Sequence, residues 1–141
     1  MPLEFSAGAI IFRREKGKKL FLLLHYASGH WDFVKGHIEK GEKIEETIIR
    51  EGEEETGIKD LKFIPGFKEK LEYFYKRDGE TYHKDVIFLL AETKTEKVKV
   101  DSPEHQGYEW LEYDDAYERL TFKTAKEILE KAGLFLEKSK I

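Results

Sequence analysis

Four glutamates crowd the end of a predicted helix: Glu51, Glu53, Glu54 and Glu55. Three of them, Glu51, Glu54 and Glu55, are spaced i, i+3 and i+4 and therefore share a face. Gly57 marks the expected helix end, where carboxylates face the negative end of the helix dipole at a cost of roughly 0.3–1 kcal/mol each. Since Mg²⁺ is bound through carboxylates, water and substrate phosphates, the cluster indicates a site for a hard divalent cation.

A solvated acidic face is the competing interpretation, and the cluster alone would favour it. The wider stretch from residue 36 to 58 changes the balance, because its residues follow the pattern G-x5-E-x7-R-E-U-x-E-E-x-G-U, where U is apolar. The matching positions are Gly36, Glu42, Arg50, Glu51, Glu54, Glu55, Gly57 and Ile58. This stretch resembles the Nudix box, the signature of the Nudix hydrolases. One position departs from it, because Gly52 stands where an aliphatic residue is usual.

Length and composition bound the class of protein. The 141 residues are expected to form a single domain spanning residues 1–141. A net charge of −4 argues against broad affinity for nucleic acid, so no stable nucleic-acid partner is expected. The absence of cysteine excludes disulfides and thiolate metal sites. With no signal pattern and no apolar run of membrane-spanning length, the expectation is a cytoplasmic monomer with no membrane contact.

The N-terminal third predicts strands. Residues 3–13 are rich in β-branched and aromatic side chains around Gly8, which is typical of a strand pair or of one bent strand. Residues 20–25 form a short continuous apolar run, which indicates a strand buried on both faces. Residues 26–34 are expected to form a loop that leads into a short strand.

The box itself predicts a loop followed by a helix over residues 43–56. Arg50 lies four residues before Glu54 and is expected to pair with it. The apolar stripe that would hold the helix on the sheet consists of Ile44, Ile48 and Ile49.

The remaining chain returns to strands and closes with helices. Residues 61–76 predict two strands separated at Pro65-Gly66, and Asp-Gly at residues 78–79 predicts a hairpin turn. The other expected elements are a strand over 81–92, a polar loop over 93–103, a strand over 108–111, and helices over 114–120 and 121–136. This order predicts an α/β/α sandwich around a mixed β-sheet, which is also the Nudix fold that the resemblance implies.

The similarity extends beyond the box to one branch of that family. The flanking matches are His30-Trp31, Lys35-Gly36-His37, Lys70–Tyr73, Lys84, Glu104–Leu111 and Phe122-Lys123. In order and spacing they resemble the asymmetrical diadenosine tetraphosphate hydrolases of animal and archaeal type. The resemblance implies a small-molecule nucleotide substrate, cleavage of diadenosine tetraphosphate to ATP and AMP, and Mg²⁺ or Mn²⁺ as the cofactor.

The resemblance also implies roles for individual acidic residues. Glu51 and Glu55 correspond to the principal metal ligands, and the carbonyl of Gly36 completes a coordination sphere. Glu54 corresponds either to a further ligand or to the base that takes a proton from water. Glu104 lies on a loop that the family brings over the metals, as a ligand or base. The expected catalytic residues are therefore Glu51, Glu54 and Glu104.

Binding of the rest of the substrate is assigned in the same way. The expected phosphate-binding cations are His30, Lys35 and Lys84. The expected adenine-stacking rings are Tyr73 and Phe122, and such stacking contributes about 1–3 kcal/mol per base.

Two other functions remain open from the sequence alone. One is a Nudix pyrophosphohydrolase that acts on 5′-triphosphorylated RNA ends, inositol pyrophosphates or nucleoside diphosphate compounds, because the box handles only the diphosphate and its metals. The other is a catalytically silent nucleotide sensor, which the intact glutamates argue against. The number of metals and the identity of the base are also open.

Overall fold

The central strand β1 (Leu3–Glu15) organises an eight-stranded mixed sheet in the computed structural model, which describes residues 2–100 and 102–141. It pairs antiparallel with β2 (Lys18–Tyr26) and β4 (Val34–His37), and parallel with β7 (Glu80–Glu92). The sequence left open a strand pair or one bent strand here, and the structure has one continuous strand.

Shorter strands extend the sheet on both sides. Strands β3 (Trp31–Asp32) and β8 (His105–Leu111) pair with β2, while β5 (Lys62–Phe63) and β6 (Glu69–Arg77) pair with β7. The predicted hairpin turn between β6 and β7 is confirmed, since Asp78 and Gly79 both have positive φ, at 52° and 77°.

Strand β8 is longer than the sequence indicated. It begins at His105, which pairs with Tyr26 across an irregularity in the ladder, and not at the expected Tyr108. Gly107 lies inside the strand and obscured its start. The expected loop over residues 93–103 is free of helix and strand where it is described, and position 101 lies outside the described residues.

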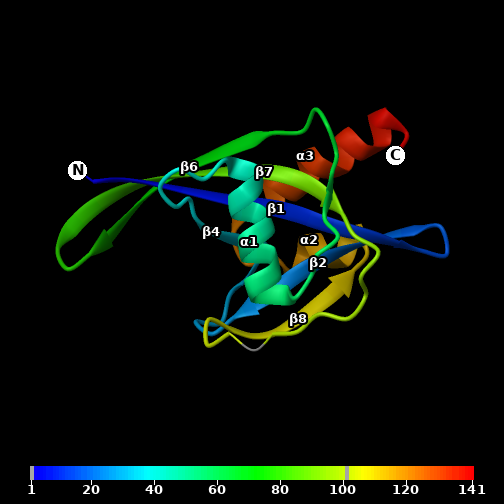
Figure 1. The fold of residues 1–141 in the computed structure, drawn as a ribbon, viewed down its shortest axis with the longest axis horizontal. Helices are drawn as coiled ribbons and strands as arrows, with labels where there is room; N and C mark the ends of the chain where they lie inside the picture. The colour runs from blue at the N-terminus through cyan, green and yellow to red at the C-terminus, as the bar shows by residue number, and fades with distance from the viewer. Residues whose placement is uncertain (1, 101) are drawn as a thin grey trace.

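Helices cover both faces of the sheet, which confirms the α/β/α sandwich (Figure 1). Helix α1 (Ile44–Thr56) lies over one face, and α2 (Tyr113–Arg119) and α3 (Lys123–Ser139) lie over the other. Alternate residues of β1 feed the two cores: Ile10 and Phe12 pack toward α2 and α3, while Ala9 and Ile11 pack toward α1.

Helix α1 keeps its predicted bounds but not its predicted stripe. Ile48 is fully buried, whereas the Ile49 side chain is 45% exposed, so that part of the expectation was wrong. The buried face continues instead through Gly52 and Glu55. A Cβ on Gly52 would lie 3.3 Å from Leu61 Cδ1, so glycine lets this face pack closely. The helix is therefore turned so that a carboxylate points inward.

Helix α3 confirms its predicted apolar face and runs on to Ser139, beyond the expected Leu136. The buried residues of this face include Ala125, Ile128, Leu129 and Ala132. Within residues 2–100 and 102–141, no helix is both long enough and apolar enough to cross a membrane.

Candidate active site

Helix α1 packs its glutamates against strand β4. The Glu55 residue is only 4% exposed, and the Glu51 side chain is 15% exposed. Gly36 on β4 lies so close to Glu51 that a Cβ added to it would be 2.1 Å from the Glu51 carboxyl carbon. The backbone of β4 and the carboxylate of Glu51 therefore form one wall of the site, and no side chain at position 36 would fit beside it.

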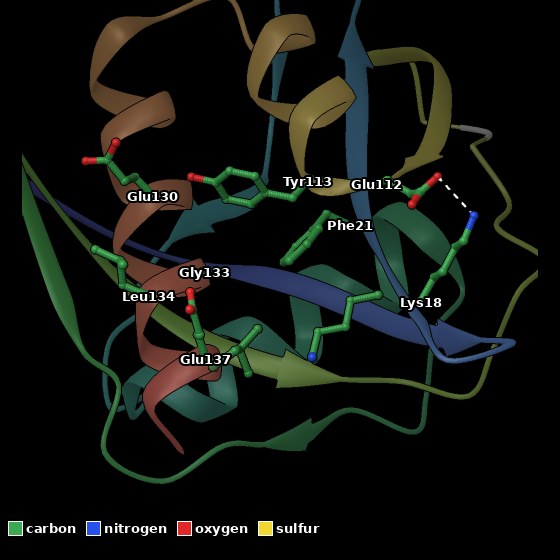
Figure 2. A pocket seen from close by; sticks show the side chains of 10 residues that line it. Lys18, Phe21, Glu112, Tyr113, Glu130, Gly133, Leu134 and Glu137 are labelled. Carbon is green, nitrogen blue, oxygen red and sulfur yellow. Dashed lines mark ion pairs between the residues drawn. The ribbon is translucent and has the colours of Figure 1, made fainter. Parts of the chain in front are cut away.

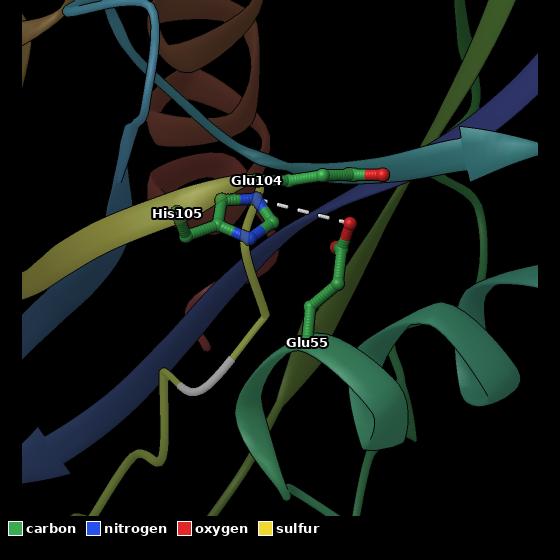
Figure 3. A group of neighbouring side chains, drawn as sticks. All are labelled: Glu55, Glu104 and His105. Carbon is green, nitrogen blue, oxygen red and sulfur yellow. Dashed lines mark ion pairs between the residues drawn. The ribbon is translucent and has the colours of Figure 1, made fainter.

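Glu104, just before β8, and His105, the first residue of β8, meet Glu55 above the last turn of α1 (Figure 3). One ligand atom from each of the three lies within 4.8 Å of the others, and His105 Nε2 is 3.8 Å from Glu55 Oε1. Glu55 Oε2 and both ring nitrogens of His105 are buried, and among the described residues they have no hydrogen-bond partner. Orphaned buried atoms of these types fit a bound divalent cation.

The electrostatics of this cluster also fit a cation. Burial, followed by the negative charges of Glu51 and Glu104, raises the pKa of Glu55 to about 9 from its ordinary value of 4.5. Burial likewise raises the pKa of Glu51. Like charges held in a low-dielectric site disfavour ionisation of each other, and a divalent ion reverses that balance. The residues present therefore suit a divalent cation.

Glu54 is placed differently from its neighbours. Its side chain is 60% exposed, and its carboxylate forms the expected ion pair with Arg50 at 3.5 Å. It is not part of the cluster of Glu55, Glu104 and His105. The structure thus brings Glu51, Glu55 and Glu104 together and leaves Glu54 at the rim.

Arg50 holds the loop of the box onto the helix. Its Nε donates to Glu42 Oε2 at 2.7 Å and its Nη2 donates to Glu42 Oε1 at 3.0 Å, a two-pronged contact stronger than the expected pair with Glu54. The same guanidinium donates from Nη1 to Glu51 Oε1 at 2.8 Å and from Nη2 to the His37 carbonyl at 3.0 Å. Arg50 therefore positions a predicted metal ligand as well as the loop.

Glu42→Gln is expected to lower the melting temperature at pH 7 because it weakens the contact with Arg50. The hydrogen bond from Arg50, followed by the one from the Glu39 amide, lowers the pKa of Glu42 to about 2 from 4.5. A lowered pKa stabilises the fold above pH 4.5, and that contribution is lost as the pH falls toward 2. Thermal unfolding at pH 7 and pH 3 tests this, with exposed Glu45→Gln as the control. A deficit equally large at both pH values would contradict it.

Two lysines face the acidic cluster across a cavity of about 370 Å³, which Lys35 and Lys84 line together with Gly36, Glu51 and Glu104. Burial alone would lower the pKa of Lys35, but the Asp32 carboxylate, 3.0 Å away, and the nearby Tyr73 outweigh burial and raise it. Burial, followed by the charge of Lys35, lowers the pKa of Lys84. Lys84 forms no ion pair with any residue that the structure describes, so its ammonium group is available to an anion in the cavity.

A second, more apolar cavity of about 420 Å³ adjoins the first at Lys35. Both predicted stacking residues, Tyr73 and Phe122, line it, together with His30. Phe122 precedes the first residue of α3, with 46% of its surface exposed, and its ring centroid lies 5.2 Å from that of His30. The structure thus places predicted phosphate and adenine residues on one continuous lining.

Three residues of this region had no assigned role in the sequence-based prediction: Tyr26, Asp32 and His105. The Tyr26 ring stacks on His30 at 4.5 Å and meets His105 edge-on at 4.4 Å, so it joins the two cavities. Asp32 is 3% exposed and accepts from Lys35 Nζ. The one sequence signal for Asp32 is that it is a polar residue between apolar residues of a strand segment. Tyr26 has no such signal, because its position depends on tertiary packing.

A larger cavity, of about 680 Å³, lies elsewhere, between β2, the start of α2 and α3 (Figure 2). Its lining includes Phe21, Tyr113 and the exposed Leu134, and a Lys18–Glu112 ion pair of 3.7 Å closes one side. Neither group of metal-ligating atoms found among the described residues lies there. Size alone therefore does not identify the reactive centre of this molecule.

The fold and the acidic helix define the class of protein: the chain belongs to the Nudix family and is a Nudix hydrolase, with the NUDIX domain matching residues 2–132. The asymmetrical bis(5′-nucleosyl)-tetraphosphatase of Mus musculus is 39% identical, over 93% of this chain and 94% of its own. The crystal structure of a C. elegans Ap4A hydrolase binary complex is 33% identical with a TM-score of 0.82, covering 95% of this chain and 98% of that one. An RNA pyrophosphohydrolase of Nitratiruptor is 30% identical, over 92% of this chain and 95% of its own.

Proposed function

We propose that this protein hydrolyses diadenosine tetraphosphate to ATP and AMP with Mg²⁺ or Mn²⁺ as cofactor. The observation that carries the proposal is the meeting of two cavities at Lys35, one lined by carboxylates and lysines and the other by aromatic rings. A polyphosphate with an adenosine at its end needs these two environments side by side. The relatives named as tetraphosphatases match nearly the whole chain, which supports the same substrate.

In this proposal, Glu51 and Glu55 hold the metal ions, with the Gly36 carbonyl and the rim residue Glu54 as further ligands. These proposed ligands all offer oxygen atoms, which Mg²⁺ prefers, while His105 lies beside Glu55 with its Nε2 3.8 Å from Glu55 Oε1. Bound divalent ions would neutralise phosphate charge and lower the pKa of a water molecule. Arg50 keeps Glu51 in place through its hydrogen bond, so that the ligand is already oriented before an ion arrives.

The proton of the attacking water needs an acceptor, and Glu104 is the better placed of the two candidate bases. It lines the cavity that also holds Glu51 and Lys84, whereas Glu54 is largely exposed and paired with Arg50. Glu104 would accept one proton as the hydroxyl group of the water bonds to one phosphorus and the bridging P–O bond breaks, and Glu104 would then pass this proton to the departing phosphate oxygen. Positioning and charge neutralisation supply most of the acceleration in reactions of this type.

Asymmetric cleavage follows from anchoring one end of a symmetric substrate. Tyr73 and Phe122 would hold one adenine, while Lys35, Lys84 and His30 bind the phosphates beside it. With one adenosine fixed at a set distance from the metal cluster, that cluster would reach an outer phosphoanhydride and not the central one, whose cleavage would give two ADP molecules. One end therefore leaves as AMP and the other as ATP.

Product analysis tests the proposal directly. Chromatography of reactions with diadenosine tetraphosphate should show equal amounts of ATP and AMP when Mg²⁺ is present and no products when a chelator removes it. Formation of two ADP molecules, or a rate that is independent of divalent ions, would overturn it.

Tyr73→Ala is expected to raise the KM for diadenosine tetraphosphate with a smaller effect on kcat. Base stacking is worth roughly 1–3 kcal/mol, which corresponds to a KM increase of about fivefold to 160-fold. Steady-state kinetics measure the change, and Tyr75→Ala is the matched control because Tyr75 lies on the same strand outside the cavity lining. An equal KM increase in both variants would show that damage to the strand, and not loss of stacking, is responsible.

A second candidate activity is removal of pyrophosphate from 5′-triphosphorylated RNA ends. It is favoured by the 30% identity to an RNA pyrophosphohydrolase over most of both chains. The two activities differ in what occupies the aromatic cavity. A comparison of kcat/KM for diadenosine tetraphosphate and for a short triphosphorylated RNA decides between them.

A further inference from the structure

The β6–β7 hairpin follows the box in the chain (Figure 1). It carries a second group of metal-ligating side chains. Glu72 on β6 is paired directly with Asp85 on β7, and His83 lies two residues before Asp85. Because side chains alternate across a strand, these three project from the same face of the sheet. One ligand atom of each lies within 4.8 Å of the others.

The three ligand atoms converge without satisfying each other. His83 Nε2 lies 3.2 Å from Glu72 Oε1 and 3.1 Å from Asp85 Oδ1. Both Nε2 and Oδ1 are buried, and within the described part of the chain neither has a hydrogen bond of acceptable geometry. Asp85 as a whole is only 8% exposed, so water does not readily take the missing place.

The spacing of these atoms matches that of ligands around a single ion. Two ligands about 2.1 Å from a tetrahedral Zn²⁺ ion lie about 3.4 Å from each other. The two distances around His83 Nε2 fall slightly below that value. A small outward movement of the exposed Glu72 side chain would make room for the ion.

We propose that Glu72, His83 and Asp85 form a site for a divalent transition-metal ion of the Zn²⁺ type, separate from the Nudix box. An imidazole with two carboxylates suits Zn²⁺ better than Mg²⁺, which prefers oxygen ligands only. Water would complete the coordination on the exposed side. The ion would tie β6 to β7 and act as a structural brace.

The surroundings of His83 orient it for this role. The Phe74 ring stacks on the imidazole, with centroids 4.8 Å apart and planes inclined by 25°. This stacked ring limits rotation of the imidazole, and a ligand held in one orientation binds a metal more strongly.

Lys70 occupies the place of a counter-ion in the absence of metal. Its Nζ lies 3.8 Å from Glu72 Oε2 and 3.6 Å from Asp85 Oδ2. Its side chain is 51% exposed, so it can swing into solvent when an ion binds. Lys70 therefore competes with the metal, and its removal should tighten metal binding.

The brace would act on the opposite face of the same hairpin. Tyr73 and Lys84 form the neighbouring cross-strand pair, and both line the cavities of the candidate active site. Fixing the pair Glu72–Asp85 restricts twisting of the ladder at Tyr73–Lys84. The hairpin should therefore unfold at a higher temperature and hold the side chains of Tyr73 and Lys84 in place.

Nuclear magnetic resonance of the histidine ring nitrogens tests the site. Zn²⁺ is added to nitrogen-15-labelled protein carrying Glu55→Gln, which weakens the site of the box. The Nε2 resonance of His83, identified by its loss in His83→Asn, should shift and saturate at one equivalent. Lys70→Gln should lower the Zn²⁺ concentration at half saturation severalfold, while His25→Asn, which removes an imidazole elsewhere, should leave it unchanged.

Thermal unfolding gives an independent measurement in the otherwise unmodified protein. Zn²⁺ should raise its melting temperature, and the increase should be smaller in His83→Asn. A His83 resonance that responds to pH but not to Zn²⁺ would show that the group is a proton-bridged ion pair and would overturn the proposal. The assignment of the His83 resonance does not depend on whether His83→Asn folds, because contacts with the Phe74 ring also identify it.

Discussion

Glu55→Gln should reduce kcat for diadenosine tetraphosphate by about a hundredfold or more while the fold stays intact. A metal contributes several kcal/mol of transition-state charge stabilisation, and each 1.36 kcal/mol is a factor of ten in rate. Glutamine keeps the shape of the side chain, so the packing around the residue, which is 4% exposed, is preserved. Single-turnover kinetics at saturating Mg²⁺ measure the loss.

The matched control is Glu53→Gln, which removes the same charge from the same helix at an exposed position. It should retain nearly full activity, because Glu53 contributes no atom to the cluster of Glu55, Glu104 and His105. If Glu53→Gln and Glu55→Gln lost equal activity, the helix charge as a whole, and not the ligand, would be responsible.

Glu55→Gln should also stabilise the metal-free protein at neutral and alkaline pH. The pKa of Glu55 is raised from 4.5 to about 9, so the fold favours the neutral carboxyl group. A raised pKa means that stability is highest below pH 4.5 and is lost as the pH rises toward 9. In the presence of a chelator, the melting temperature of the unaltered protein should therefore fall over that range, and that of Glu55→Gln should fall less. Identical pH profiles would contradict the burial of this charge.

Local signals in the sequence were sufficient for much of the fold. Gly57 has a φ of 77° and ends α1 where a glycine was expected to end it. Asp78-Gly79 likewise makes the predicted turn. These features depend on residues that are neighbours in the chain, and each has one dominant conformational preference. The helix and hairpin that carry the site were therefore predictable.

The orientation of α1 was less predictable. Three isoleucines suggested the buried face, yet Ile49 is exposed and Glu55 is buried. A hydrophobic pattern ranks a glutamate as a surface residue, because burying a carboxylate without a partner is costly. A bound cation would compensate the charge of the buried Glu55 carboxylate. The hydrophobic pattern therefore failed at the residue that the proposed chemistry needs most.

The sequence pattern alone could not show which residues from distant parts of the chain come together in the site. Tyr73 lies on β6 and Phe122 lies just before α3, yet both line one cavity with His30. No periodicity links these positions, and their selection depended on resemblance to related proteins. His105 was missed because a histidine next to Glu104 has no distinctive signal until β8 is paired with β2.

Gly36→Ala should reduce kcat/KM by about a hundredfold with only a small loss of stability. The added Cβ would lie 2.1 Å from the Glu51 carboxyl carbon and 2.3 Å from its Oε1, far inside contact distance. Strand β4 cannot retreat easily, because Gly36 is paired with Ala7 of β1. The flexible end of Glu51 moves instead, which costs little folding free energy but displaces a proposed metal ligand. Gly107→Ala is the control, since its Cβ would enter open space.

A double-mutant cycle locates the cause of that loss. Glu51→Asp shortens the side chain by one methylene group and vacates the space that a methyl group at position 36 would occupy. Combining Gly36→Ala with Glu51→Asp should then lower kcat/KM little further than Glu51→Asp alone, because contacting residues are not additive. Full additivity would mean that the methyl group acts elsewhere on β4. Non-additivity with an unchanged melting temperature would assign Gly36 a positioning role: its missing side chain leaves room for the carboxylate of Glu51.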